Sequence, residues 1–400
     1  MDARLKRKRI ALIIAHLGPG GAQRVVATAA NALAERGIDT HVITVLDDHT
    51  DAYQLDPRVR RHRRKAPEKL AETFGQSPSP HQLGILRRAA RQTIRYLSRY
   101  ELVRRPLGVA AFGVNLVTRA RWLRRSIRGI EPDAVISFLT QTNILTILAA
   151  RGLTGRIIVS ERNDPRLQRV RRRVVLMRKL TYPWADLVTA NTHGALAEME
   201  SFVPRSNLAF LPNPLNSPNH SACVNFAAPT FITVTRLVEQ KALDILLKAA
   251  ARAFESLPGW RLAVAGDGPL RDELKSLAHR LGIGPRVDWL GYVDEPMAYL
   301  RAAKVFVLTS RFEGSPNALL EAMACGLPSI VSDASPGPVE LVGGAGLIVP
   351  VEDVSATADA LIKLGQNEVL RARLGAAALE RTRMHQLDNA MQVWLELLRA

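Results

Sequence analysis

Cysteine is scarce in this sequence of 400 residues, which contains only Cys223 and Cys325. Two thiols cannot form the disulfide framework of a small secreted domain, so we expect a reducing, cytoplasmic environment. No run approaches the roughly 18 consecutive apolar residues of a membrane-spanning helix. The longest candidate, 106–117, is shorter and contains glycine and asparagine. The sequence therefore argues against a disulfide-rich secreted module and against an integral membrane protein.

A secretory leader is also disfavoured, although the N-terminus resembles one at first. Basic residues at 6–9 precede the apolar run 10–14, as they do in a signal peptide. The apolar run is short, however, and leads directly into Gly18-Pro-Gly-Gly21. We interpret it as a first buried strand.

The alternation of elements predicts two α/β domains. Hydrophobic residues make up 47% of the chain and charged residues 23%, which suffices for sizeable cores. At about 150 residues per domain, the length fits two domains better than one. Short apolar strands alternate with helical segments, which indicates parallel sheets covered on both faces. The expected strands are 10–15, 40–45, 134–138, 157–160, 187–190, 230–235, 261–265, 287–290, 305–309, 328–331 and 346–349.

Turn-forming residues over 212–219 indicate a linker between the domains. We therefore predict two doubly wound, Rossmann-like domains, one over 1–212 and one over 224–385, joined by a linker over 213–223. Sheets of this kind bind ligands at the carboxyl ends of their strands. The expected binding site is thus a cleft between the two domains.

The net charge of +18 comes entirely from the first half. Residues 1–215 hold 37 Lys and Arg against 17 Asp and Glu (+20), whereas 216–400 hold the remaining 18 against 20 (−2). Such asymmetry predicts a polyanionic partner for the first half. No base-reading motif accompanies the charge, so we do not expect that partner to be nucleic acid.

Basic amphipathic segments account for much of this excess. Helices expected over 83–105 and 110–128, and a stripe over 167–177, place Leu, Ile, Val, Met or Trp beside arginines. This composition favours peripheral binding to an anionic membrane. The alternative is that the helices only pack against their own domain and leave their arginines in solvent.

Three motifs carry chemistry, and the first is Gly18-Pro-Gly-Gly21, between the first strand and the first helix. Glycines let the backbone approach a ligand, and the helix start offers unpaired N–H groups to an anion. The motif lacks both the G-x-G-x-x-G spacing and the lysine of a Walker loop. These residues alone therefore leave open a tight turn or a ligand-binding loop.

The second motif is a pair of cations, Arg236 and Lys241, after the first strand of the second half. At the carboxyl end of a strand both side chains could reach one diphosphate. Paired cations there would stabilise the charge that grows on a departing phosphate. The alternative is an ordinary solvated loop.

The third and strongest motif runs from Ser310 to Glu321. Glu313 lies in a turn before a helix expected to begin near Pro316, where proline is favourable. The N–H groups of 314–318 would be unpaired and able to meet hydroxyl or phosphate oxygens. Glu321 follows Glu313 by eight positions, so two carboxylates could bind the vicinal hydroxyls of a sugar and of a ribose. A structural role for both acids is the alternative.

Together these motifs resemble a retaining glycosyltransferase with the GT-B fold, of family 4 of the nucleotide-sugar-dependent transferases. The resemblance covers nearly the whole chain and depends on the order and spacing of several motifs. These are Gly20 to Arg24, Arg236 with Lys241, Gly266-Asp-Gly-Pro269, Leu290-Gly-Tyr-Val293, and Glu313 with Glu321.

The resemblance implies a role for each matching residue. Arg236 and Lys241 would bind the donor diphosphate, and Glu313 would hold the transferred sugar. Glu321 would bind the ribose hydroxyls. Further donor contacts would come from Gly266, Gly291, Tyr292, Val293 and the loop Gly314, Ser315, Pro316 and Asn317. Gly20, Gly21, Arg162 and Asn163 would lie on the acceptor side. No metal or cofactor is implied, and a helix over 386–400 would pack back onto the N-terminal domain.

The chain departs from the family at several points. Ala242 and Thr235 stand where glycine is usual or frequent, and Ser160-Glu-Arg-Asn-Asp164 stands where many members carry a histidine. That segment resembles a subgroup acting in bacterial exopolysaccharide, lipopolysaccharide and lipid-linked glycan assembly, with Arg162 and Asn163 pointing into the cleft. Glu161 would either substitute for the histidine or fold away into an ion pair. The loop 140–143 is a further acceptor-side candidate.

The expected reaction is transfer of a hexose from a nucleoside diphosphate sugar to an acceptor hydroxyl, with the anomeric configuration retained. The charge excess and the resemblance favour a lipid-linked saccharide as the acceptor, at the inner face of the membrane. Two other functions stay open at this point: a nucleotide-sugar epimerase on the same fold, and a non-catalytic basic protein that binds membrane or nucleic acid.

Overall fold

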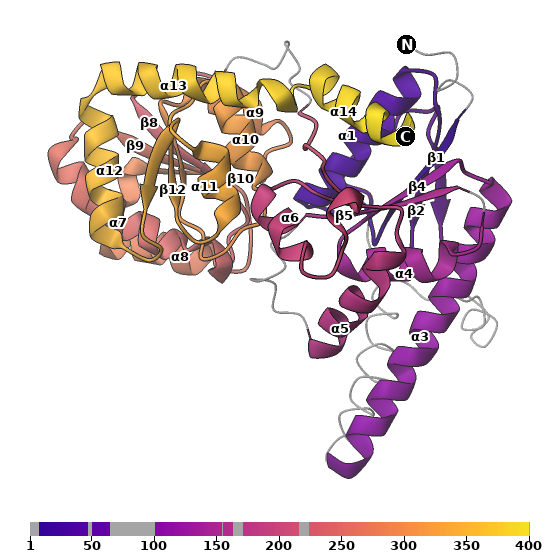
Figure 1. The fold of residues 1–400 in the computed structure, drawn as a ribbon. Coiled ribbons are helices and arrows are strands. Elements are labelled where there is room, and N and C mark those ends of the chain that lie inside the picture. The colour runs from indigo at the N-terminus through magenta and orange to yellow at the C-terminus, as the bar shows by residue number, and fades with distance from the viewer. Residues whose placement is uncertain are drawn as a thin grey trace, which may run out of the picture.

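The computed structural model describes residues 8–46, 50–64, 101–153, 155–162, 171–215 and 224–399, and only the backbone of 101–115. Two α/β lobes lie side by side, each with helices around a central sheet (Figure 1). The first lobe is built from the N-terminal half and the second from the C-terminal half.

The first sheet has seven strands within the described residues, in the order β3-β2-β1-β4-β5-β6-β7. All pairs are parallel. Its strands are β1 (Arg9–Ile14), β2 (Asp39–Thr44), β3 (Arg60–Arg63), β4 (Ala134–Phe138), β5 (Arg156–Glu161), β6 (Leu187–Ala190) and β7 (Leu208–Phe210). The two edge strands β3 and β7 were not predicted, because Arg60–Arg63 has no apolar pattern and Leu208–Phe210 has only three residues.

The second sheet has six strands in its described part, in the order β10-β9-β8-β11-β12-β13, also with parallel pairs. They are β8 (Thr230–Val234), β9 (Arg261–Ala265), β10 (Val287–Gly291), β11 (Val305–Leu308), β12 (Ser329–Ser332) and β13 (Gly346–Val349). In both sheets the order reverses beside the first strand, as in doubly wound folds.

Helices cover both faces of each sheet (Figure 1). The first lobe has α1 (Gly21–Glu35), α3 (Glu101–Ile130), α4 (Thr140–Ala150), α5 (Arg172–Thr181) and α6 (His193–Met199). The second has α7 (Leu243–Ser256), α8 (Arg271–Arg280), α9 (Pro296–Ala302), α10 (Asn317–Ala324), α11 (Pro336–Val342), α12 (Val354–Gln366) and α13 (Glu368–Thr382), followed by α14 (Leu387–Arg399).

The central strands of each sheet are buried on both faces, which explains why they are largely apolar. In β1, Ile10, Leu12 and Ile14 join one core while Ala11 and Ile13 join the core on the opposite face. The second lobe likewise has a core on each side of its sheet.

The described residues pass from one lobe to the other at two places, after Leu215 and between α13 and α14. After the second lobe, α14 returns to the first, where Trp394 is 1% exposed and packs in the same core as Ile10. The Trp394 indole N–H donates to the Pro212 carbonyl at 3.1 Å. The two crossings are joined where the Leu215 N–H donates to the His385 carbonyl at 2.7 Å.

The predicted basic helices are only partly within the described residues. The segment 83–100 and residues 167–170 lie outside them. The helix expected over 110–128 is longer, because α3 runs from Glu101 to Ile130 and projects from the first lobe (Figure 1). Among the described helices, none combines the length and the apolar character that a bilayer crossing requires.

Candidate active site

The carboxyl ends of the strands of both sheets face each other across the lobe interface. The start of α1, after β1, meets α10, which follows β11. The start of α6, after β6, meets α11, which follows β12, where Glu340 accepts from the His193 N–H at 2.9 Å. This edge of a parallel sheet is where such folds bind ligands.

A cavity of about 540 Å³ lies at this interface. One wall is formed by α1 and by residues 52–54 of the first lobe, and the opposite wall by residues 292–297 with α10. Three predicted donor-binding residues line it: Tyr292, Asn317 and Glu321. Its volume lies within the range of about 300–1,000 Å³ that is typical of small-molecule binding sites.

Lys241 and Glu313 form an ion pair in the second lobe. Their side chains are only 14% and 9% exposed. The Ser310 hydroxyl donates to the same carboxylate oxygen of Glu313 at 2.7 Å, and the Ser335 hydroxyl accepts from the Glu313 N–H at 3.2 Å. Glu313 is therefore held on several sides, and its pairing with Lys241 places a cation and an acid at one point.

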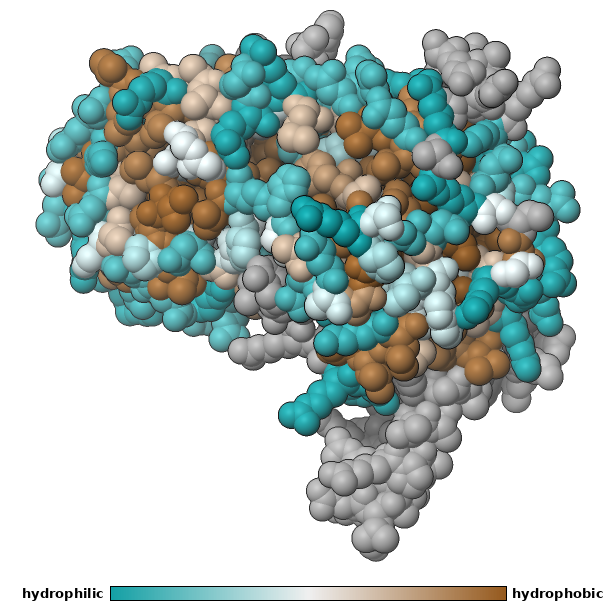
Figure 2. All heavy atoms as spheres, viewed as in Figure 1, coloured by the Kyte–Doolittle hydropathy of each residue, from teal (hydrophilic) through white to brown (hydrophobic). Residues whose placement is uncertain are grey.

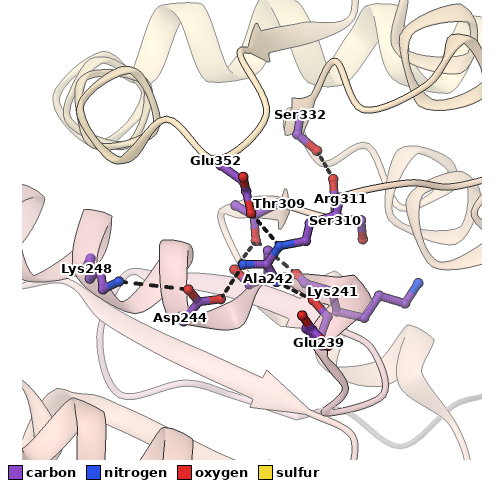
Figure 3. A network of polar contacts seen from close by, with 10 residues as sticks. All are labelled: Glu239, Lys241, Ala242, Asp244, Lys248, Thr309, Ser310, Arg311, Ser332 and Glu352. Atoms are coloured by element: carbon purple, nitrogen blue, oxygen red, sulfur yellow. Dashed lines mark hydrogen bonds and ion pairs between the residues drawn. The ribbon is translucent and has the colours of Figure 1, made fainter.

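Hydrogen bonds from side-chain hydroxyls to backbone carbonyls fix the loops that carry this pair. The Thr309 hydroxyl donates to the Ala242 carbonyl at 3.1 Å, and the Ser332 hydroxyl donates to the Ser310 carbonyl at 2.6 Å. Arg311 adds ion pairs to Glu352 and Asp244 (Figure 3). The Lys241 side chain extends away from this network (Figure 3), so the network fixes its loop and leaves its ammonium group for Glu313.

Arg236 lies on the exposed loop after β8, and no other described side chain or backbone group engages its guanidinium group. The loop passes close to Gly266: a Cβ at that glycine would lie 1.7 Å from the Thr235 carbonyl oxygen. The Gly266 N–H donates to the Gly291 carbonyl at 2.6 Å. Three strand ends therefore meet closely, and the glycine makes this approach possible.

The predicted base-binding stretch follows directly. Gly291 has a φ of 70°, a left-handed conformation that glycine adopts without strain, and Tyr292 is 61% exposed beside the cavity. Val293 continues this exposed turn.

Glu321 is almost fully buried, with its side chain 5% exposed, and it is paired with Arg24 of α1. Burial raises the pKa of the Glu321 carboxyl above its ordinary value, and the Arg24 guanidinium opposes part of that rise. Because α10 begins at Asn317, Glu321 lies about one turn into the helix. The carboxylate that was predicted to bind a ribose is thus held by a cation from the opposite lobe.

The glycine loop lies directly opposite α10. The Asn317 side-chain amide donates to the Gly21 carbonyl at 2.9 Å, and the Tyr53 hydroxyl contacts the backbone of Gly20. The segment Gly314–Pro316 is packed as tightly on its other side, since a Cβ at Gly337 would lie 1.7 Å from the Gly314 carbonyl oxygen. The Ser315 hydroxyl has no hydrogen-bond partner among the described residues.

Sequence similarity identifies the family. Residues 19–217 match the family Glycosyltransferase Family 4, and residues 225–381 match Glycosyl transferases group 1. The chain belongs to glycosyltransferase family 4. It is a retaining glycosyltransferase that uses nucleotide sugars, and the prediction of this enzyme class is confirmed.

Two relatives from Campylobacter jejuni illustrate the similarity. One, 28% identical over 98% of both chains, is the α-1,4-N-acetyl-D-galactosaminyltransferase named for GalNAc-α-(1→4)-GalNAc-α-(1→3)-diNAcBac-PP-undecaprenol. The other, 26% identical over 91% of this chain and 92% of its own, is named an N-acetylgalactosamine-N,N'-diacetylbacillosaminyl-diphospho-undecaprenol 4-α-N-acetylgalactosaminyltransferase.

Solved structures of similar shape confirm the predicted GT-B fold. Sucrose-phosphate synthase from Thermosynechococcus elongatus superposes with a TM-score of 0.74 at 18% identity, covering 98% of each chain. The Anabaena protein HepE, crystallised with UDP, superposes with a TM-score of 0.72 at 17% identity, covering 98% of this chain and 99% of its own.

The departure of this family 4 member at Ala242 has a structural consequence. Ala242 is in the left-handed region, with φ 47° and ψ 43°, and is 1% exposed. A residue with a Cβ pays about 1–2 kcal/mol for this conformation. A glycine at this position would take the same conformation without strain.

Glu161, which stands where many members of the family carry a histidine, lies inside the first lobe. Glu161 is buried and accepts hydrogen bonds from the hydroxyls of Thr140, at 2.9 Å, and of Tyr182. Burial raises the pKa of Glu161, and it raises the pKa of Tyr182 well above the usual value. The loop 140–143, taken as an acceptor-side candidate, is the first turn of α4, where Asn143 also binds the Tyr182 hydroxyl. Glu161 is therefore folded into its own lobe by hydroxyl partners.

Arg162 was expected to point into the cleft, but it is 5% exposed and is packed against residues of the first lobe, α14 and the linker. Its guanidinium group lies beside the stacked rings of Phe138 and Trp394, 5.3 Å from the first centroid and 5.9 Å from the second. It donates to Asn213 at 2.5 Å. Asn163, predicted with it, lies outside the described residues.

Sequence reasoning missed three contributors: Arg24, Ser310 and Asn213. Arg24 belongs to the recognised motif 20–24, and Ser310 opens the recognised motif 310–321, but neither position indicates its partner. Asn213 was grouped with the linker. Within the described ranges, no three His, Cys, Asp or Glu side chains gather into a set that could hold a metal ion.

Proposed function

We propose that this enzyme transfers a hexose from a nucleoside diphosphate sugar to a hydroxyl of a lipid-linked saccharide in bacterial glycan assembly. The buried ion pair of Lys241 with Glu313, on the loops that follow β8 and β11, supports this most directly. Glu321, on α10 after the Glu313 loop, lines the interlobe cavity. The named acceptor of the Campylobacter jejuni relatives, a diphospho-undecaprenol-linked saccharide, supports the acceptor class. UDP in the HepE crystal makes UDP-linked sugars the first donors to test.

The roles of the residues follow from their chemistry. Lys241 and Arg236 would bind the donor diphosphate, Glu313 and the loop 314–317 would hold the sugar, and Glu321 would accept from the ribose hydroxyls. Donor binding must then separate Lys241 from Glu313, and Arg24 from Glu321, because each pair occupies groups that the donor needs.

The transfer would proceed on one face of the sugar. The acceptor oxygen forms a bond to the anomeric carbon while the bond from that carbon to the phosphate oxygen breaks. The acceptor's proton passes to the departing diphosphate, whose growing charge Lys241 and Arg236 stabilise. Because two cations supply this stabilisation, we propose that the reaction needs no divalent metal.

A donor screen in chelator tests this proposal. The purified chain is incubated with UDP-GalNAc, UDP-GlcNAc, UDP-galactose, UDP-glucose and GDP-mannose in EDTA, with and without a diphospho-undecaprenol disaccharide. Released nucleoside diphosphate that depends on the acceptor is expected for one donor. Sugar isomerised without acceptor would instead establish an epimerase, and activity only after Mg²⁺ is added would refute metal independence.

The first lobe also carries a surface suited to the membrane where such an acceptor lies. On α5, Leu176 and Leu180 are 58% and 55% exposed, one turn apart, beside the exposed Arg172 and Lys179. Trp184 follows, 46% exposed, with Arg151 stacked over its ring at 4.2 Å. Figure 2 shows apolar atoms over this part of the first lobe. Apolar side chains ringed by cations match an anionic bilayer surface.

Vesicle cosedimentation tests this surface. Vesicles of phosphatidylglycerol and phosphatidylethanolamine should retain the protein, and Leu176→Ser with Leu180→Ser should lower the bound fraction about ten-fold. Val369→Ser is the matched control, since Val369 is 81% exposed on α13 of the other lobe. Equal binding by both variants, or binding that ignores the phosphatidylglycerol content, would rule the surface out.

A further inference from the structure

Asn213, the residue after Pro212 in the linker, stands at the centre of a chain of hydrogen bonds that joins the two lobes. It is 3% exposed. Its side-chain oxygen accepts from Arg162 at 2.5 Å, and its side-chain nitrogen donates to the Asn317 side-chain oxygen at 2.6 Å. The Asn317 nitrogen then donates to the Gly21 carbonyl at 2.9 Å. The chain thus runs from β5 through the linker to α10 and back to the glycine loop.

The polarity of this chain is fixed at both ends. A guanidinium group can only donate, so Asn213 must turn its oxygen toward Arg162 and its nitrogen toward Asn317. A backbone carbonyl can only accept, so Asn317 must turn its nitrogen toward Gly21 and its oxygen toward Asn213. One orientation of each amide satisfies all three contacts, and the two ends demand the same one.

Arg162 is well suited to set this polarity. It is buried beside two stacked aromatic rings, and its Nη1 atom also donates to the Leu211 carbonyl at 3.2 Å. Burial lowers the pKa of Arg162 to about 9, which still leaves the group protonated at pH 7. Asn191 supports the same Asn213 oxygen at 3.2 Å but has no contact with Asn317 in this chain of bonds.

The geometry points to Asn213 as a positioning residue for the donor site, an assignment that rests on the proposed function. It transmits the orientation fixed by Arg162 in the first lobe to Asn317, the first residue of α10, in the second. By holding Asn317 against Gly21, it favours the closed arrangement in which the loop 314–317 faces the first lobe. The fraction of molecules in that arrangement sets the apparent affinity for the donor.

The substitution Asn213→Asp separates this role from a structural one. The carboxylate still accepts from Arg162 and Asn191, and the charged pair with Arg162 should keep the melting temperature at or above that of the wild type. The carboxylate cannot donate to the side-chain oxygen of Asn317. Asn317 can then donate to only one neighbour, and its oxygen must face the other acceptor, either the carboxylate or the Gly21 carbonyl. We expect the donor KM to rise about ten-fold, with kcat within about two-fold, because bound donor restores closure.

Asn191→Ala is the matched control. It removes a contact to the same Asn213 oxygen and leaves the link to Asn317 intact, so its donor KM should stay within about two-fold of the wild type. A wild-type KM for Asn213→Asp overturns the assignment. A fall in kcat at unchanged KM overturns it equally. The assignment also fails if Asn213→Asp and Asn191→Ala both show a raised KM together with a lowered melting temperature.

A second measurement needs no substrate. Small-angle X-ray scattering of the ligand-free protein should show a larger radius of gyration for Asn213→Asp, and also for Asn317→Asp, which cannot donate to the Gly21 carbonyl. If neither variant expands, the assignment is wrong, whichever donor the enzyme uses. If both expand while the wild type turns over no nucleotide sugar, the proposed function fails and the coupling between the lobes stands.

Discussion

The two lobes share one architecture but differ in how they present their functional residues. In the second lobe, which is nearly neutral, Lys241 and Glu313 form an ion pair on loops that follow strands, and Glu321 of α10 lines the interlobe cavity. In the strongly basic first lobe, Arg162 is buried and Glu161 is held by hydroxyl partners. The second lobe thus carries the residues that we propose contact the donor, whereas Glu161 is engaged inside the first lobe and Arg162 is bound to Asn213.

This division explains why one lobe was easier to interpret from sequence. A loop between a strand and a helix fixes the position of Glu313 locally, so spacing alone was informative. The position of Arg162 depends on Trp394, more than 200 residues away in the chain. Local pattern does not encode that contact.

The largest expected effect tests whether the first lobe depends on the last helix. Trp394→Ala removes a fully buried ring from the core of the first lobe and should cost about 3–5 kcal/mol of unfolding free energy. Hydrogen exchange should show loss of protection in β1 and β4 and little change in β9. Equal loss in both lobes would contradict the assignment of α14 to the first.

The next prediction concerns Lys241 in the second lobe. Lys241→Ala should lower kcat/KM by about 10²–10³ through loss of a charge-stabilising group. Lys248→Ala is the control, because Lys248 is an exposed lysine on α7 that pairs only loosely with Asp244, at 3.9 Å. Steady-state rates with the best donor distinguish them, and equal rates for the two variants would remove Lys241 from the site.

A third prediction uses the contact between the lobes at Glu321. Because burial raises its pKa, protonation should begin to weaken donor binding while the pH is still above 4.5. Below that point the neutral acid accepts less well from ribose hydroxyls. Glu321→Gln should raise the donor KM about ten-fold at pH 7 and should lack this acid-side dependence. A KM profile that is the same for both proteins would exclude Glu321 as the titrating group.

The smallest effect is expected at Ala242. Ala242→Gly removes the strain of the left-handed conformation, which favours the folded state. It also removes a buried methyl group and raises the entropy of the unfolded chain, which both oppose folding. The free energy of unfolding should therefore change by less than about 1 kcal/mol. Ala242→Val should be clearly destabilising, because a β-branched residue fits this conformation poorly. Thermal melts of the two variants settle the point. A stable valine variant would show that the loop adopts another shape.

Much of the fold could be predicted, and the exceptions have physical causes. The strand expected over 10–15 is β1 (Arg9–Ile14), because continuous apolar runs mark strands buried on both faces. The edge strand β3 was missed because its four residues are Arg and His, and only the ladder to β2 makes them a strand. At the site, the sequence indicated Glu321 but not Arg24, since nothing local links residues that lie 297 positions apart.

The double passage of the chain between the lobes also determines how they can move. The two connecting segments lie next to each other at Leu215 and Gln386, where the Leu215 N–H donates to the His385 carbonyl. Two adjacent connections of this kind form a hinge. They would allow the lobes to rotate about one axis and would resist translation or twisting of one lobe against the other. Leu215 and Leu387 line the cavity beside this hinge. In a hinge motion of the lobes, that wall would shift least and the far rim would open most.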